Sequence, residues 1–320
     1  MNSEEIRESF LNYFESQYHM RYPSSSLIPV GDPTLLLTNA GMVQFKSFFS
    51  GDEKPPSDML TTSQKCFRTV DIDEVGDSTH LTFFEMLGNF SIGKYFKQDA
   101  IKYSIDYLTN VLKLDIKRLY ITIHDSDNES SVFWNEVGIP DERIYKFGSE
   151  DNWWGPAGSE GPCGPCSELH YDFGDDVPQC GLDSCGPNCD VVINKNGDTC
   201  ERVIELWNLV FMQFYQDQSG NRKLLPAPSV DTGMGFERLA VIMQKVRSIY
   251  DTDLFMPIIN LIEQKCEKKY KNNESDDVAF RIVSEHMRSS TFLIGDGVIP
   301  GNEGRSYVLR RILRRAIRYS

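Results

Sequence analysis

The pattern of hydrophobic residues changes at Gly235, and that change limits the architectures open to the chain. Before it, short segments rich in β-branched and aromatic residues stand between Gly, Pro, Asn or Asp, which is typical of strands. These segments are residues 34–38, 82–87, 118–124 and 203–214. After it, apolar residues recur at helical spacing in residues 236–246, 253–268, 277–294 and 307–318. The sequence therefore predicts a sheet followed by helices.

Helices are also expected within the first part of the chain. Residues 3–20 form an amphipathic stretch that Ser3 can cap, and residues 98–112 form a second one. Strands and helices do not alternate regularly, so the predicted fold class is α+β, with an antiparallel or mixed sheet rather than a doubly wound one. We place a boundary between a core of residues 1–248 and a helical appendage of residues 249–320.

The 33 basic and 47 acidic residues give a net charge of −14, which by itself argues against a nucleic-acid partner. The charge is unevenly spread, however. Residues 125–176 hold thirteen acidic and two basic residues, whereas residues 305–320 hold six arginines and no acid. Like charges four residues apart on a helix repel each other. Contact with a phosphate backbone therefore explains the arginines better than an ordinary solvated face does.

No apolar run approaches the roughly 20 residues of a membrane helix, and the N-terminus does not resemble a signal peptide. We therefore expect a cytoplasmic protein with no membrane partner. Eight cysteines in such a chain suggest free thiols or metal ligands before disulfides. Four share one Gly/Pro/Asn-rich stretch and could bind a structural zinc ion, the alternative being an irregular insertion with free thiols. They are Cys180, Cys185, Cys189 and Cys200.

Cys163 and Cys166 form a separate pair in the segment G-P-C-G-P-C. Its Pro and Gly residues predict a tight turn. A redox role for the C-x-x-C pair is the alternative, but no βαβ pattern surrounds it to support that role.

Arg68 and Phe84 are candidates for binding a nucleotide. Arg68 precedes an acidic loop, where its planar guanidinium can bind an anion. The strand that follows places Phe84 and Met86 on one face, and Phe83 and Glu85 on the other. An aromatic side chain beside an arginine can stack on a nucleobase, although most such phenylalanines are simply core.

The segment 228–238 joins a strand to a helix. Gly233 and Gly235 permit close approach to the backbone, and Arg238, one turn into the helix, can bind a phosphate or lie across a flat base. Asp231 is placed to hold an ammonium group, the alternative being a cap of the helix.

Several long strings occur in a fixed order along the chain. They are D-P-T-L-L at 32–36, T-N-A-G-M at 38–42, Arg68, T-F-F-E-M-L-G-N-F at 82–90, G-P-C-G-P-C-S-E at 161–168, E-L-W-N-L-V-F-M-Q-F at 205–214 and V-D-T-G-M-G at 230–235. Together they resemble the alanyl-tRNA synthetase family, which belongs to the class II aminoacyl-tRNA synthetases. The likeness runs from Arg7 to Arg318, and strings of this length and order do not arise by chance.

The resemblance implies an antiparallel sheet that binds ATP and is flanked by helices. It also implies a ligase of translation: alanine and ATP would form alanyl-adenylate and pyrophosphate, and the alanyl group would pass to the 3′ end of tRNA(Ala). The catalytic arginines would be Arg68 and Arg238. ATP, with Mg²⁺, would be bound by Arg68, Phe84, Glu85, Met86, Gly235 and Arg238. Alanine would be bound by Arg68, Trp154, Asn208, Val210, Asp231 and Gly233.

By the same resemblance, the helical segment would recognise the tRNA acceptor stem through Asn302, Arg305, Arg310, Arg311 and Arg314. A pocket for one methyl group excludes glycine and serine only weakly, because one methylene is worth about 1–3 kcal/mol. The family corrects such errors with an editing region, and it carries a C-terminal oligomerisation region as well. We therefore expect an N-terminal catalytic part of a longer protein, or a natural minimal form, in which adenylate formation survives and tRNA charging is weak.

The chain departs from the family pattern after Arg68. The loop to Glu74 is short and acidic and lacks the family's lysine. An arginine often found before the phenylalanines is also absent; His80 is the candidate to replace it, and a purely structural histidine is the equal alternative. Two other functions fit part of the pattern: a ligase that loads an amino acid onto a carrier protein, and a non-catalytic RNA-binding or zinc module. Asn302 and the arginine helix argue against the first. The arginines at 68 and 238 argue against the second.

Overall fold

The computed structural model describes residues 1–30, 32, 34–174, 180, 182, 185–187, 189, 200 and 202–320. Within them, nine strands form a mixed sheet in the order β1-β2-β3-β9-β8-β7-β4-β5, with β6 paired to β7. The strands are β1 (Met20–Arg21), β2 (Met59–Phe67), β3 (Phe83–Ser91), β4 (Leu119–His124), β5 (Ile144–Phe147), β6 (Trp153–Trp154), β7 (Gly161–Asp172), β8 (Val203–Gln216) and β9 (Arg222–Gly235).

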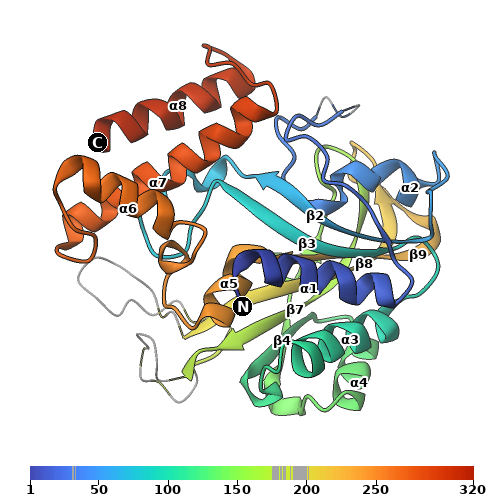
Figure 1. The fold of residues 1–320 in the computed structure, drawn as a ribbon. Coiled ribbons are helices and arrows are strands. Elements are labelled where there is room, and N and C mark those ends of the chain that lie inside the picture. The colour runs from blue at the N-terminus through green and yellow to red at the C-terminus, as the bar shows by residue number, and fades with distance from the viewer. Residues whose placement is uncertain are drawn as a thin grey trace.

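The central strands of this sheet run antiparallel, whereas the pairs β1–β2 and β4–β5 are parallel. Helices flank the sheet, as Figure 1 shows, so the predicted α+β class is confirmed. The helices are α1 (Ser3–Ser16), α2 (Lys46–Ser50), α3 (Lys97–Ile105), α4 (Asn128–Glu136), α5 (Phe236–Gln244), α6 (Met256–Cys266), α7 (Glu274–Gly295) and α8 (Gly304–Tyr319).

Alternating side chains of β8 separate the two faces of the sheet. Leu209 and Phe211 pack with Phe10 of α1 in one apolar cluster, on the face that α1, α3 and α4 cover in Figure 1. Val210 and Met212 pack with Phe90 of β3 in a second cluster on the opposite face. Each fully buried large side chain stabilises the fold by about 2 kcal/mol. The second face remains partly open, and it carries the cavity described below.

The cap of α1 differs from the prediction. Asn2, rather than Ser3, precedes the helix: its Oδ1 accepts a hydrogen bond from Glu5 N at 2.8 Å, and the Glu5 carboxylate accepts one from Asn2 N at 2.9 Å. Ser3 lies inside the first turn, where its N donates to Asp253 Oδ2 at 2.8 Å. The reciprocal pair satisfies two helix-end donors, which a serine cap at position 3 would not do.

The strands predicted at 82–87, 118–124 and 203–214 are confirmed in β3, β4 and β8. The strand predicted at 34–38 is wrong, because this segment forms turns and bends. Only Thr38 bridges two other segments, with its N donating to Leu27 O at 2.9 Å and its O accepting from Phe67 N at 2.8 Å. The helix predicted at 98–112 is α3 continued by a π-helix, Asp106–Val111.

The turn predicted around Cys163 and Cys166 is also wrong, since both cysteines lie within β7. The pairing of β7 with β8 shifts register between them, and the backbones come unusually close there. A Cβ atom on Gly164 would lie 2.0 Å from Phe211 O. Glycine is required here for close strand approach at a bulge, not for reversing the chain.

The helices predicted after Gly235 are confirmed as α5 to α8, and the last three gather at one end of the sheet (Figure 1). Phe280 of α7 packs with Leu81 and Val241, and Leu309 of α8 packs with Phe83. The helical segment therefore shares its apolar clusters with the sheet. The boundary at residue 248 stays a prediction. Among the residues that the structure describes, no helix has the length and apolarity to cross a membrane.

Candidate active site

A cavity of about 290 Å³ lies on the face of the sheet opposite α1. Strands β3, β8 and β9, the segment between β2 and β3 and the start of α5 supply most of its walls. It brings together every residue predicted to bind ATP or alanine except Glu85. These residues are Arg68, Phe84, Met86, Trp154, Asn208, Val210, Asp231, Gly233, Gly235 and Arg238.

Glu85 points to the other face of β3. Its carboxylate accepts two hydrogen bonds from Arg7 of α1, both at 2.7 Å, and a third from Ser63 Oγ at 2.9 Å. Its backbone N donates to the Glu237 carboxylate at 3.1 Å. Strand alternation separates Glu85 from Phe84, and the structure therefore does not bring its carboxylate to the cavity.

Two arginines and an aromatic ring form the polar end of the cavity. The Arg68 guanidinium carbon lies 5.1 Å from the centroid of the half-buried Phe84 ring, and Arg68 Nε donates to Asn39 O at 3.3 Å. Arg238 Nη1 donates to Glu205 O at 2.8 Å and to Glu205 Oε2 at 3.1 Å. Both guanidinium planes are thus held by acceptors, and this end can bind a flat base together with anionic groups.

Asp231 forms the opposite, buried part of the cavity. It lies on β9 directly across from Val210 of β8, and it is 5% exposed. Burial raises the pKa of its carboxyl to about 7. A cation that enters this pocket would favour the ionised form of the Asp231 carboxyl, so the position suits recognition of an ammonium group.

Position 233 accommodates only glycine, because Met86 occupies the space that a side chain would need. A Cβ on Gly233 would lie 2.7 Å from Met86 Sδ. The same sulfur accepts a weak hydrogen bond from Gly41 N at 3.2 Å. The Met86 side chain is thereby fixed between the T-N-A-G-M segment and β9, next to Asp231.

Other cavity residues were given no individual role from the sequence, apart from His80. Glu168, Glu205 and Glu237 line the cavity, and the first two fall inside strings of the family pattern that carried no individual role. His80 also lines it. A hydrogen bond to Asp77 raises the pKa of the His80 imidazole, so it is more readily cationic than a free histidine.

The residues predicted to bind tRNA lie on α8 or just before it, outside the cavity lining. Arg310 and Arg314 are exposed, and Arg310 donates to Asn302. Arg311 instead pairs with Asp73 of the acidic loop at 2.6 Å, and Arg305 is half-buried. The arginine helix therefore does have one acidic partner, which comes from far away in the sequence.

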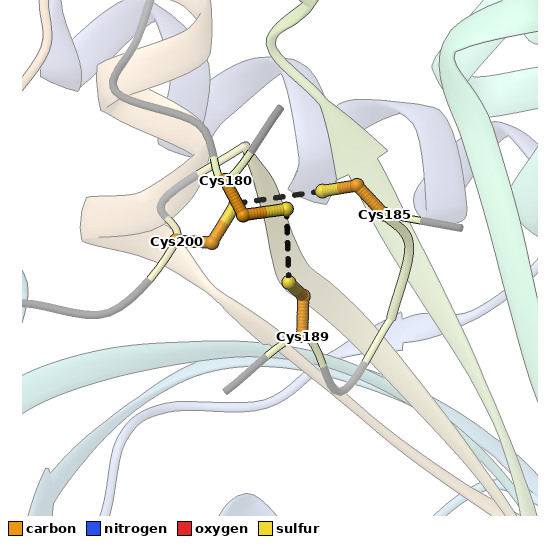
Figure 2. A group of neighbouring side chains, drawn as sticks. All are labelled: Cys180, Cys185, Cys189 and Cys200. Carbon is orange, nitrogen blue, oxygen red and sulfur yellow. Dashed lines mark hydrogen bonds between the residues drawn. The ribbon is translucent and has the colours of Figure 1, made fainter. Parts of the chain in front are cut away.

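The four predicted zinc ligands converge. Cys185 Sγ lies 3.4 Å from Cys200 Sγ, and Cys189 Sγ lies 3.4 Å from Cys180 Sγ, as Figure 2 shows. All four sulfur atoms lie within 4.8 Å of one another. Tetrahedral zinc with Zn–S bonds of about 2.3 Å needs sulfur atoms roughly 3.8 Å apart, so this set fits one ion.

Comparison with known proteins agrees with the geometry. Residues 5–320 match the family described as tRNA synthetases class II (A). The chain is 54% identical over 316 residues to an alanine–tRNA ligase of Dehalococcoides mccartyi, covering 99% of this chain and 35% of that protein. It is 50% identical to an alanine–tRNA ligase of a Thermoanaerobacter species, covering 98% and 35%.

The chain thus spans about a third of the length of the curated relatives it matches. Among solved structures, a histidyl-tRNA synthetase of S. aureus aligns at 12% identity and a TM-score of 0.44, over 78% of this chain and 68% of that one. With a family match over nearly its whole length, the chain belongs to the class II (A) tRNA synthetases.

Proposed function

We propose that this chain activates alanine with ATP, forming alanyl-adenylate and pyrophosphate, and that it contributes this step to an alanine–tRNA ligase. The observation that carries the proposal is one cavity with an unpaired buried carboxyl at one end and two arginines beside an aromatic ring at the other. The ammonium group of an amino acid is complementary to the buried carboxyl, and the phosphates and base of a nucleotide are complementary to the arginines and the aromatic ring. The relatives named alanine–tRNA ligase support the choice of alanine.

Arg68 would hold the α-phosphate of ATP and the carboxylate of alanine. Negative charge concentrates there as the carboxylate attacks phosphorus, so a fixed cation lowers the barrier most at that point. Phe84 and Arg238 would hold the adenine between them. No general base is needed, because the carboxylate of alanine is already ionised at neutral pH.

Asp231 would bind the ammonium group of alanine. Trp154 and Val210 belong to the same apolar cluster, and they would leave room for a single methyl group beside it. Larger side chains would clash with this wall, whereas serine and glycine would be rejected only weakly.

ATP would carry Mg²⁺, which neutralises the charge of the β- and γ-phosphates. Carboxylate oxygens are suitable ligands for this ion, and both Glu205 and Asp71 line the cavity. The residues present therefore fit a cation bound together with ATP.

Transfer of the alanyl group to tRNA(Ala) would follow. The exposed Arg310 and Arg314 of α8, with Asn302, would meet the acceptor stem. We propose residues 1–248 as the activating part and residues 249–320 as the tRNA-facing part. The apolar cluster shared by Leu81, Ile249 and Phe280 supports one folded body with two tasks.

The decisive experiment is alanine-dependent exchange of pyrophosphate into ATP. Wild type should exchange with alanine in preference to larger amino acids, and Arg68→Ala should reduce the rate by about 100-fold or more, as loss of a transition-state donor does. Asp231→Ala should raise the KM for alanine and leave the KM for ATP unchanged. A wild type without exchange for any amino acid would contradict the proposal.

We also propose a structural zinc ion at Cys180, Cys185, Cys189 and Cys200, supported by the convergence of their sulfur atoms. Metal analysis after exhaustive dialysis should give about one zinc per chain. Cys189→Ser should lose the metal, whereas the exposed Cys266→Ser, outside the cluster, should retain it. Less than about half an equivalent in wild type would leave the four cysteines as free thiols.

A further inference from the structure

Three neighbouring strands place one residue each in a row beneath the cavity. Glu168 of β7 lies directly opposite Asn208 of β8, and Asn208 lies directly opposite Gly233 of β9. Directly opposed residues of antiparallel strands share a face. All three line the cavity, and Asp231 lies two residues from Gly233 on the same face.

The hydrogen bond between the first two residues fixes which way the Asn208 amide faces. Asn208 Nδ2 donates to Glu168 Oε1 at 2.8 Å. An ionised carboxylate can only accept hydrogen bonds, so the NH₂ group must face Glu168. The carbonyl oxygen of the same amide therefore points away from Glu168.

That oxygen has no partner in the free protein. Asn208 Oδ1 is buried and accepts no hydrogen bond from the described residues. A buried acceptor without a donor destabilises the fold. A substrate that brings a donor into the pocket would form the missing hydrogen bond with Asn208 Oδ1.

Glu168 is itself held in place from β4 and β7. Its Oε2 accepts a hydrogen bond from Thr122 Oγ1 at 3.2 Å and lies 3.4 Å from His170 Nε2. These contacts leave Oε1 for Asn208. Glu168 thus joins the outer strands of the sheet to a pocket residue.

We propose that Glu168 is a positioning residue that orients the Asn208 amide, so that Asn208 Oδ1 accepts a hydrogen bond from the ammonium group of the bound amino acid beside Asp231. This inference rests on the proposed function. An ammonium group has three donors, of which Asp231 uses one. A flipped amide would present its NH₂ group to a cation and would repel it.

The test compares Glu168→Leu, Glu168→Gln and Asn208→Ala in pyrophosphate exchange. Glu168→Leu should raise the KM for alanine about tenfold or more, as loss of a hydrogen bond to a charged group does, while the KM for ATP changes less than twofold. Glu168→Gln keeps an oxygen acceptor for Asn208 Nδ2 and should stay within about threefold of wild type. Because both residues act through one contact, the Glu168→Leu/Asn208→Ala double variant should be no worse than Asn208→Ala alone.

The matched control is Asp172→Leu. Asp172 is also an acid of β7 and is more buried than Glu168, but it pairs with Arg202 and does not line the cavity. Its substitution should leave the KM for alanine unchanged. If Glu168→Leu does not fold, Thr122→Val, which removes only one hydrogen bond to Glu168, should raise the KM for alanine alone by a few fold.

Three results would overturn the inference: equal increases in both KM values, additive penalties in the double variant, or a Glu168→Gln variant as impaired as Glu168→Leu. Pyrophosphate exchange in the wild type distinguishes failure of this inference from failure of the proposed function. If the wild type shows no exchange, both the proposed activation of alanine and the role of Glu168 are wrong. If the wild type exchanges normally and any of the three results is found, only the role of Glu168 is wrong.

Discussion

Asp231 is a buried carboxyl of the cavity whose position lowers the stability of the free protein. No hydrogen bond or ion pair to its carboxylate is found in the described part of the chain. Burial raises its pKa to about 7, well above the ordinary value near 4. The unfolded chain therefore ionises this group first. As the pH rises from about 4 to about 7, Asp231 makes a growing unfavourable contribution to folding, which is constant at higher pH.

We predict that Asp231→Asn stabilises the free protein and abolishes alanine binding. The gain in the free energy of unfolding should be on the order of 1–4 kcal/mol at pH 8 and much smaller at pH 5, because each pKa unit corresponds to about 1.4 kcal/mol. Urea denaturation at the two pH values checks this. An equal effect at both pH values would show that burial does not hold the proton on Asp231.

At the scale of an element, the pairing of β7 with β8 determines the conformation of β7. Its Gly and Pro residues predict a turn locally, and only the pairing with β8 makes the segment a strand. The register shift between Cys163 and Cys166 lets two backbones meet at Gly164. Four residues beyond Gly164, the strand places Glu168 opposite Asn208.

Gly164→Ala should therefore destabilise the protein by about 1–3 kcal/mol, as overpacking does, because its Cβ would lie 2.0 Å from Phe211 O. Gly295→Ala is the matched control. No atom lies within 4 Å of its added Cβ, so thermal unfolding should show little change or a small gain. Equal melting temperatures for the two variants would contradict the close approach.

The proposed contact of α8 with tRNA can be tested separately from alanine activation. Arg310→Glu and Arg314→Glu should each lower alanyl transfer to tRNA about tenfold, since a charge reversal loses one phosphate contact and adds repulsion. Pyrophosphate exchange should be unchanged, because neither residue lines the cavity. Lys102→Glu on α3 is the control, being exposed as well. Parallel losses of exchange and transfer would indicate a general folding defect.

For the whole molecule, the helical segment completes the core of the sheet. Removing residues 249–320 would expose Leu81, Val241 and Phe83, which pack against helices of that segment. We predict that a fragment of residues 1–248 loses cooperative unfolding and binds a hydrophobic dye. A sharp transition at the melting temperature of the full chain would contradict this and would make residue 248 a true folding boundary.

The net charge of the whole molecule does not describe the charge of its separate surfaces. The net charge of −14 describes solubility better than partners, because α8 alone carries six arginines. One of them, Arg311, is paired with Asp73, and an exposed pair of this kind contributes about 1 kcal/mol or less. Arg310, Arg314 and Arg318 are exposed on the same helix, so the positive charge of α8 is local and is hidden in the total for the chain.

The sequence by itself determined the helices after Gly235 and the strands β3, β4 and β8, and all of its predicted ATP and alanine residues except Glu85 line the cavity. Periodicity and long family strings are properties of neighbouring residues, so they can be interpreted without coordinates. Only the tertiary structure decided that G-P-C-G-P-C is a strand, that Glu85 faces Arg7, that Arg311 meets Asp73 and that Asn208 donates a hydrogen bond to Glu168. Each of these depends on strand order and register, which bring together residues far apart in the chain and which local pattern does not specify.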